Sequence, residues 1–167
     1  MAIKDALLPE FDHEMATTRR VLERVPAERG DWKPHPKSME LAQLAGHLAE
    51  IPGYGLAVLG ADDFDIAAGN YAPLRFESRD QALGAFDDLV AKTRAAIAAT
   101  DDETFLRTWT FRNGAQAVFA APKVGALRTF FMNHLIHHRG QLTVYLRLLD
   151  VPLPSVYGPT ADEQMFG

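Results

Sequence analysis

Apolar side chains recur at every third or fourth residue in four stretches of the chain, and this spacing predicts four amphipathic helices. The first stretch runs from Ile3 to Val25 and is closed by Pro26, which cannot continue a helix. The second runs from Ser38, a candidate N-cap residue, to Leu59. Within this second stretch, Pro52-Gly53 should kink or interrupt the helix.

The other two predicted helices lie in the second half of the chain. One begins at Ser78, which forms a capping-box pattern with Gln81, and its apolar stripe reaches Ile97. The other begins near Pro122, a favourable first-turn residue, and runs to about Leu149. The inward stripe of this last helix is predicted to contain Leu127, Phe131, His134, His138, Leu142 and Tyr145.

The connecting segments complete the predicted architecture. The segment from Trp109 to Val118 alternates around Asn113-Gly114, a pattern typical of a tight β-hairpin. A long connection spans Asp62 to Phe76, and the tail from Val151 to Gly167 carries enough apolar residues to pack back on the helices. We therefore expect an all-α fold, a four-helix bundle with a small β-hairpin between the third and fourth helices, in one domain covering residues 1–167.

Composition restricts the class of protein. The chain has 167 residues, of which 47% are hydrophobic and 23% charged, a balance typical of one soluble globular domain. Its net charge of −5 argues against nucleic-acid binding. No apolar run approaches the roughly 20 residues of a membrane span, and the first residues lack the pattern of a signal peptide, so we expect no membrane contact and a cytoplasmic location. Cysteine is absent, so any metal must be held by His, Asp or Glu.

Three histidines occupy positions where a helical core would normally place leucine. His134 and His138 are four residues apart, so their side chains lie about 40° apart around the helix axis and roughly 6 Å apart along it. Two imidazoles at that spacing can chelate one ion. His47 lies on the apolar side of the second helix, and it would bring a third nitrogen if the two helices face each other.

An alternative interpretation is that these are core histidines hydrogen-bonded to protein groups. Three unpaired imidazoles buried together would cost roughly 1–3 kcal/mol each, and a metal ion removes that cost. His137, His13 and His35 are interpreted as surface or loop residues, although His35 could approach the site from its loop. Glu50 either orients a ligand or is a solvated helix charge.

Two long segments carry a resemblance to a known family. The sequence NHLIHHRGQLTVYLR from Asn133 to Arg147, followed by PLPSVYGPTADE from Pro152 to Glu163, resembles the C-terminal signature of the DinB/YfiT-like family. The sequence WKPHPKSMELAQLAGHLAEIP from Trp32 to Pro52 resembles the other landmark of that family. The segments occur in the order found in the family, and the resemblance extends over nearly the whole chain.

The resemblance implies a four-helix bundle that binds a divalent metal through one histidine of the second helix and two of the fourth. Those positions correspond to His47, His134 and His138. Similar proteins are described with nickel, zinc or iron and often as homodimers. The family was first grouped by damage-inducible expression, which implies a stress response. Related proteins transfer low-molecular-weight thiols.

A three-histidine site leaves coordination positions open, which is typical of catalytic metal sites. The first hypothesis is therefore a metal-dependent enzyme, such as a low-molecular-weight-thiol S-transferase acting on small electrophiles. The alternatives are a metal-dependent hydrolase and a non-catalytic stress-related metal-binding protein. No general base can be named. Tyr145, Gln141 and Glu50 are candidates to lie behind the ligands, and Arg139 or Arg128 could bind the carboxylate of a thiol.

Overall fold

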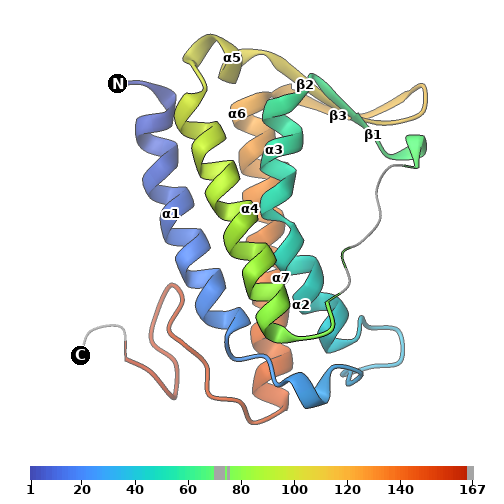
Figure 1. The fold of residues 1–167 in the computed structure, drawn as a ribbon, viewed down its shortest axis with the longest axis vertical. Helices are drawn as coiled ribbons and strands as arrows, with labels where there is room; N and C mark the ends of the chain where they lie inside the picture. The colour runs from blue at the N-terminus through green and yellow to red at the C-terminus, as the bar shows by residue number, and fades with distance from the viewer. Residues whose placement is uncertain (70–73, 75, 165–167) are drawn as a thin grey trace.

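A computed structural model describes residues 1–69, 74 and 76–164 of the chain. The long helices lie side by side, with a small sheet at one end and the C-terminal segment at the other (Figure 1). The fold is helix-rich, as expected, and consists of α1 (Ile3–Leu22), α2 (Leu41–Glu50), α3 (Pro52–Gly60), α4 (Arg79–Ala99), α5 (Asp102–Leu106), α6 (Lys123–Ala126), α7 (Asn133–Leu148), the 3₁₀ turns Ala27–Arg29 and Ile66–Ala68, a π-helical segment Leu127–Met132, and strands β1 (Asp63–Asp65), β2 (Thr108–Asn113) and β3 (Gln116–Pro122).

Helix α4 packs against α1, α2 and α3, and α7 packs against α1 and α2. The predicted apolar stripe of α1 is buried at Leu7, Phe11, Met15 and Leu22. The helix ends at Leu22, three residues earlier than the predicted Val25. Helix α4 begins as predicted, because Ser78 accepts a hydrogen bond from the backbone N–H of Gln81.

The start of α2 differs from the prediction. The helix begins at Leu41 rather than after Ser38, and no side chain caps it. Instead, the N–H of Leu41 donates to the carbonyl of Trp32 and that of Ala42 to the carbonyl of Gly30. These loop carbonyls satisfy N–H groups that a side-chain cap would otherwise serve. The predicted interruption at Pro52-Gly53 is confirmed, since α2 ends at Glu50 and α3 starts at Pro52.

The last predicted helix is divided by the π-helical segment Leu127–Met132, which separates α6 from α7. Such segments often occur at functional sites. The predicted inward stripe is correct in part, with Leu127, Phe131 and Leu142 buried and His134, His138 and Tyr145 partly buried. The buried face of α7 also includes Leu135, Arg139 and Leu146, which the prediction left out.

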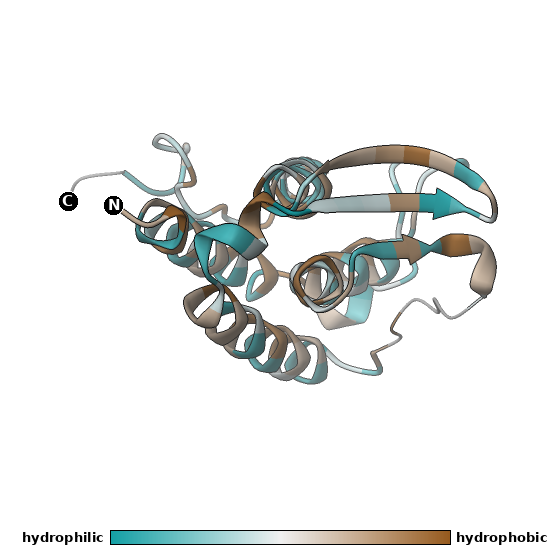
Figure 2. Ribbon diagram, turned by 90° about the horizontal axis from the view of Figure 1, so that it is seen from above, coloured by the Kyte–Doolittle hydropathy of each residue, from teal (hydrophilic) through white to brown (hydrophobic). Residues whose placement is uncertain are grey.

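The sheet contains one strand more than the sequence predicted. Strands β2 and β3 form the expected antiparallel hairpin, and Gly114, at φ +60°, occupies the first position of the loop. Strand β1, which lies in the segment predicted to be a plain connection, pairs in parallel with β2. Residues 70–73 and 75 of that predicted connection lie outside the described residues. Seen from above, the sheet extends to one side of the helices, away from the N-terminus (Figure 2).

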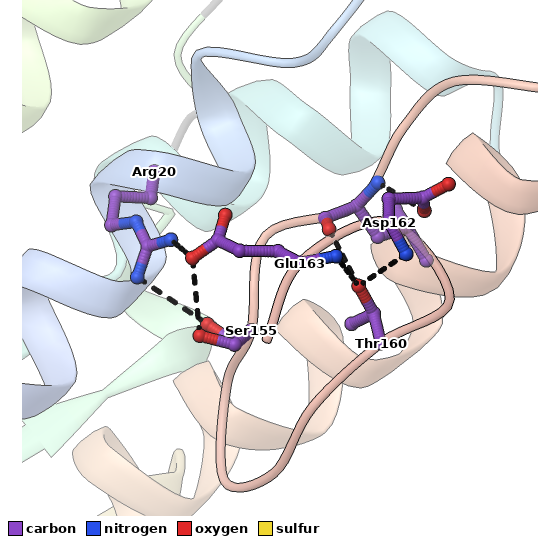
Figure 3. A network of polar contacts seen from close by, with 6 residues as sticks. Arg20, Ser155, Thr160, Asp162 and Glu163 are labelled. Carbon is purple, nitrogen blue, oxygen red and sulfur yellow. Dashed lines mark hydrogen bonds and ion pairs between the residues drawn. The ribbon is translucent and has the colours of Figure 1, made fainter. Parts of the chain in front are cut away.

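Buried polar contacts attach the ends of the helices to their neighbours. Lys123, only 2% exposed, donates hydrogen bonds to the carbonyls of Leu59 and Ala61 at the end of α3. The C-terminal segment packs back on the helices as predicted. Asp162 and Glu163 anchor this segment through hydrogen bonds and ion pairs, of which the Glu163 contacts with Arg20 and Ser155 are drawn in Figure 3. Among the described residues, no helix is long and apolar enough to cross a membrane.

Candidate metal centre

The three predicted histidines meet between α2 and α7. His47 projects from α2, and His134 and His138 project from successive turns of α7. Each offers one ring nitrogen to a group of atoms that all lie within 4.8 Å of one another. Nε2 of His47 and Nε2 of His134 are 3.3 Å apart. The structure therefore brings together the residues that helical spacing selected.

These separations fit a metal ion. Zinc–imidazole bonds of about 2.0–2.1 Å in tetrahedral geometry place two ligand nitrogens about 3.3–3.4 Å apart. The distance between Nε2 of His47 and Nε2 of His134 lies at the lower end of that range. Imidazole suits zinc, nickel and iron alike. The cluster can thus hold a divalent cation between α2 and α7.

Two neighbouring side chains fix which nitrogen faces the cluster. Nδ1 of His47 lies 2.8 Å from Oε1 of Glu50, and Nδ1 of His138 lies 2.8 Å from Oε1 of Gln141. Because these oxygens accept hydrogen bonds, each Nδ1 carries the proton and each Nε2 keeps its lone pair. Gln141 and Glu50 therefore lie behind the clustered histidines, where the sequence analysis named both as candidates.

Glu50 is not the solvated charge that one interpretation of the sequence allowed. Its side chain is 5% exposed, and its second oxygen, Oε2, accepts a hydrogen bond of 2.7 Å from the backbone N–H of Leu74. The carboxylate thus joins His47 to the chain segment that precedes α4. Its position three residues after His47 was the signal in the sequence.

Burial favours the neutral form of two of the three rings. The pKa of His134 is lowered to about 4, mainly by burial and also by the nearby His138 and His47 rings, whereas the backbone carbonyl of Phe130 opposes the shift. Burial likewise lowers the pKa of His138, against the effect of its hydrogen bond with Gln141. Neutral imidazole is the form that binds metal.

The remaining histidines stay outside the cluster, as the sequence suggested. His137 is exposed, although its ring centroid lies 4.9 Å from that of His138. His13 is exposed and stacks on Tyr157. His35 is also exposed, and its Nδ1 accepts a hydrogen bond from the backbone N–H of Lys37. The idea that His35 reaches the site from its loop is therefore wrong.

Three other sequence candidates serve different purposes. Arg139 is 1% exposed and forms an ion pair with Glu14 of α1, so it is not available to bind a thiol carboxylate. Arg128 pairs with Glu10 at the surface. The hydroxyl of Tyr145 donates to the carbonyl of Met39 rather than contacting a histidine.

A cavity of about 400 Å³ adjoins the cluster and was not predicted from the sequence. His134 and Glu50 form its polar part, and much of the remainder is aromatic. The aromatic rings come from α3, β1, β2 and the π-helical segment: Tyr54, Phe64, Phe111 and Phe130. No spacing rule relates residues on four such elements, so the sequence contained no simple signal for this cavity.

The fold resembles several solved structures. A DinB-like protein from Bacillus cereus ATCC 10987 superposes with a TM-score of 0.73 at 21% identity, covering 93% of this chain and 98% of its own. A DinB-like protein from Bacillus subtilis gives 0.69 at 18% identity, with coverages of 96% and 99%. A DinB-family member from Exiguobacterium sibiricum 255-15 gives 0.65 at 21% identity, with coverages of 93% and 97%.

Sequence comparison points the same way. The uncharacterized protein YrdA of Bacillus subtilis (strain 168) is 44% identical over 39 residues, a segment that spans 23% of either chain. The model of the DinB superfamily matches residues 10–142, which include all three clustered histidines. This match covers most of the described helices, and the expected family is confirmed. The chain belongs to the DinB superfamily.

Proposed function

We propose that this chain is a metalloenzyme whose helices form the family's four-helix bundle and bind one divalent metal ion through His47, His134 and His138. The observation that supports the proposal most strongly is the convergence of three partly buried imidazoles. Two of them have their Nδ1 atoms engaged by Glu50 and Gln141, which leaves Nε2 for a ligand bond. Imidazole donors accommodate zinc, nickel, iron and copper, and the family resemblance favours the first three.

A metal held by three histidines keeps positions open and lowers the pKa of a thiol or water molecule bound there. The protein's own residues set the conditions for that chemistry. Glu50 and Gln141 hold their histidine rings in fixed orientations. The aromatic wall that includes Tyr54 and Phe130 limits the access of water to one side of the cluster.

The reaction we propose is transfer of a low-molecular-weight thiol to a small electrophile. In this reaction, the thiol loses its proton to solvent and the sulfur electron pair forms a bond to carbon. For a chlorinated electrophile, the carbon–chlorine bond breaks and its electron pair leaves with chloride. The apolar cavity beside His134 favours this reaction over hydrolysis of charged esters, because it offers room for an uncharged reactant next to the cluster.

Metal binding is tested first, by titrating metal-free protein with zinc, nickel and ferrous ions in competition with a chelator. We expect one ion per chain and a loss of affinity on the order of 100-fold or more in His134→Ala, since even residues behind a ligand contribute 10–100-fold. His137→Ala is the matched control, because its ring is exposed and lies outside the cluster. Equal affinities for the two variants would overturn the assignment of ligands.

Activity is tested with metal-loaded protein, a low-molecular-weight thiol and a chlorodinitrobenzene. Thiol loss and chloride release should rise together in the parent protein and in His137→Ala, and fall to the background rate in His134→Ala. Turnover of an ester without added thiol would show that the protein is a hydrolase rather than a thiol transferase. Equal rates of thiol loss in all three proteins, combined with a lower melting temperature on chelation, would instead assign the metal a stabilising role.

A further inference from the structure

The cavity beside the histidines has walls that are almost entirely apolar. Besides its aromatic side chains, it is lined by Ala57 of α3, Ile66 of the 3₁₀ turn after β1, Leu74 in the segment before α4, and Leu89 of α4. Ile66 and Leu74 are 45% and 46% exposed, which is high for large aliphatic residues that face other apolar groups. Their exposed surface is available to a ligand that fills the cavity.

The aromatic side chains of the cavity form a connected series of rings. Tyr54 stacks on Phe130 with ring centroids 5.5 Å apart and an interplanar angle of 28°. Phe130 contacts Phe111 at 5.2 Å, and Phe111 stacks on Phe64 at 6.1 Å and 5°. The sheet therefore has a role at the site, because β1 and β2 bring Phe64 and Phe111 against the helices. Such a wall favours flat aromatic ligands.

Charge further restricts the ligand. No lysine or arginine occurs among the described residues that line the cavity. Its carboxylate, Glu50, already accepts hydrogen bonds from His47 and from the backbone N–H of Leu74, and it would repel an anion. Burial of an unpaired ionic group against these walls is costly. The lining thus favours an uncharged molecule.

The volume indicates the size of the ligand. An apolar cavity of about 150 Å³ is enough to bind benzene. The volume of about 400 Å³ at this site accommodates a molecule with two fused rings. Of the polar lining groups, His134 belongs to the histidine cluster and Glu50 contacts His47. A polar substituent of the ligand therefore finds hydrogen-bonding partners at this end of the cavity.

We infer that this cavity binds an uncharged aromatic molecule of about two rings, with its polar or reactive substituent directed toward His134. The identification of this molecule as the electrophilic substrate rests on the proposed function; binding in the cavity does not.

Binding is tested with naphthalenemethanol as the neutral ligand and naphthoate as its anionic counterpart, by calorimetry on zinc-loaded and on chelator-treated protein. Ala57→Leu fills part of the cavity from α3, and Ile66→Asp places a charge at its exposed edge. Ala95→Leu, on the exposed face of α4, is the control for adding the same side chain. We expect saturable binding of naphthalenemethanol to the parent chain and Ala95→Leu, and binding about tenfold weaker in the two cavity variants.

Naphthoate should bind chelator-treated protein at least about tenfold more weakly than the alcohol does. Unchanged affinity for naphthalenemethanol in both Ala57→Leu and Ile66→Asp would overturn the inference. Tighter binding of naphthoate than of naphthalenemethanol to chelator-treated protein would overturn it as well. The metal titration is a separate measurement. Aromatic binding without metal binding refutes the metalloenzyme and leaves the cavity assignment standing, whereas metal binding without aromatic binding refutes the cavity assignment alone.

Discussion

Nη2 of Arg139 lies 2.7 Å from Oε2 of Glu14, and both side chains are almost completely buried between α7 and α1. The contact is a buried ion pair. Nη1 of Arg139 donates to the hydroxyl of Thr18, and the hydroxyl of Tyr157 donates to Oε1 of Glu14. Arg139 directly follows His138, so one turn of α7 faces the histidine cluster on one side and α1 on the other.

Removing one charge of this pair should destabilise the fold strongly. In Glu14→Gln, the buried guanidinium of Arg139 loses its counter-charge, and we expect a loss of about 3–5 kcal/mol in the free energy of unfolding. Urea denaturation measures the change. Glu10→Gln, also on α1, breaks the exposed pair with Arg128 and should cost less than about 1 kcal/mol. Similar losses in the two variants would show that burial of the Glu14 pair is not what matters.

The carboxylate of Glu50 should increase metal affinity through His47. In Glu50→Gln, the negative charge next to Nδ1 of His47 is lost, and we expect the dissociation constant for zinc to rise about 10–100-fold. Competition with a chromogenic chelator measures it. Glu40→Gln makes the same chemical change at the exposed N-cap of α2 and should leave zinc affinity unchanged. An unaltered affinity in Glu50→Gln would show that the carboxylate does not support the ligand.

Gly55 allows α3 to approach α4 closely. A Cβ atom at this position would lie 2.5 Å from Cγ2 of Thr93, whose hydroxyl is already fixed by its hydrogen bond to the carbonyl of Pro52. We expect Gly55→Ala to lower the melting temperature, corresponding to a loss of about 1–3 kcal/mol. Gly84→Ala is the matched substitution, because a Cβ atom meets nothing within 4 Å in the interior of α4. It should stabilise the protein by about 0.5–1 kcal/mol, and a gain at both positions would contradict the close approach.

The C-terminal segment should loosen in acid. Asp162 pairs with Arg147 and accepts a hydrogen bond from the N–H of Leu153, and these contacts hold its pKa below the ordinary value. A carboxylate with a lowered pKa in the folded state stabilises the protein above its unfolded pKa, and the effect is lost as the pH falls through the folded value. Asp162→Asn should therefore melt at a lower temperature than the parent at pH 7, and the difference should begin to shrink at about pH 4 and disappear once the pH falls below the lowered pKa of Asp162.

Thermal melts across this pH range, together with hydrogen exchange of residues 153–163, measure the loosening of the segment. Asp31→Asn, in an exposed loop, should follow the parent at every pH. If the difference between Asp162→Asn and the parent persisted in strong acid, the ionised form of Asp162 could not be what holds the segment.

Helical spacing, which is a local property, selected the three histidines, and the family resemblance predicted that the two helices carrying them meet. His134 and His138 share a face by their separation of four residues, and His47 lies in register with buried Leu44 and Ile51. Charged residues were harder to place. Glu50 and Arg139 are buried because each finds a partner on another part of the chain, and sequence spacing does not reveal those partners.

The sheet was predicted only in part and the cavity not at all, because both depend on contacts between distant parts of the chain. Strand β1 has three residues, too few for an alternating pattern, and its pairing with β2 joins segments about 47 positions apart in register. The predicted cap at Ser38 failed because carbonyls of Gly30 and Trp32, in the preceding loop, reach the first turn of α2. Each of these incorrect or incomplete predictions involves a contact between two segments whose relative position cannot be deduced from local sequence spacing.

The interruption at Pro52 divides one apolar stretch into two short helices, each with its own packing contacts. The first helix, α2, carries His47 and Glu50, and the second, α3, carries Tyr54 and Ala57 of the cavity wall. Helix α3 is held against α4 by contacts of Pro52 and Gly55 with Thr93. Tyr54 is the α3 residue whose ring packs against His47 and His134. Substitutions elsewhere along α3, such as at Ala57, can therefore change the cavity wall without displacing the histidines. In any relative that shares this break, the wall is free to diverge while the cluster stays the same.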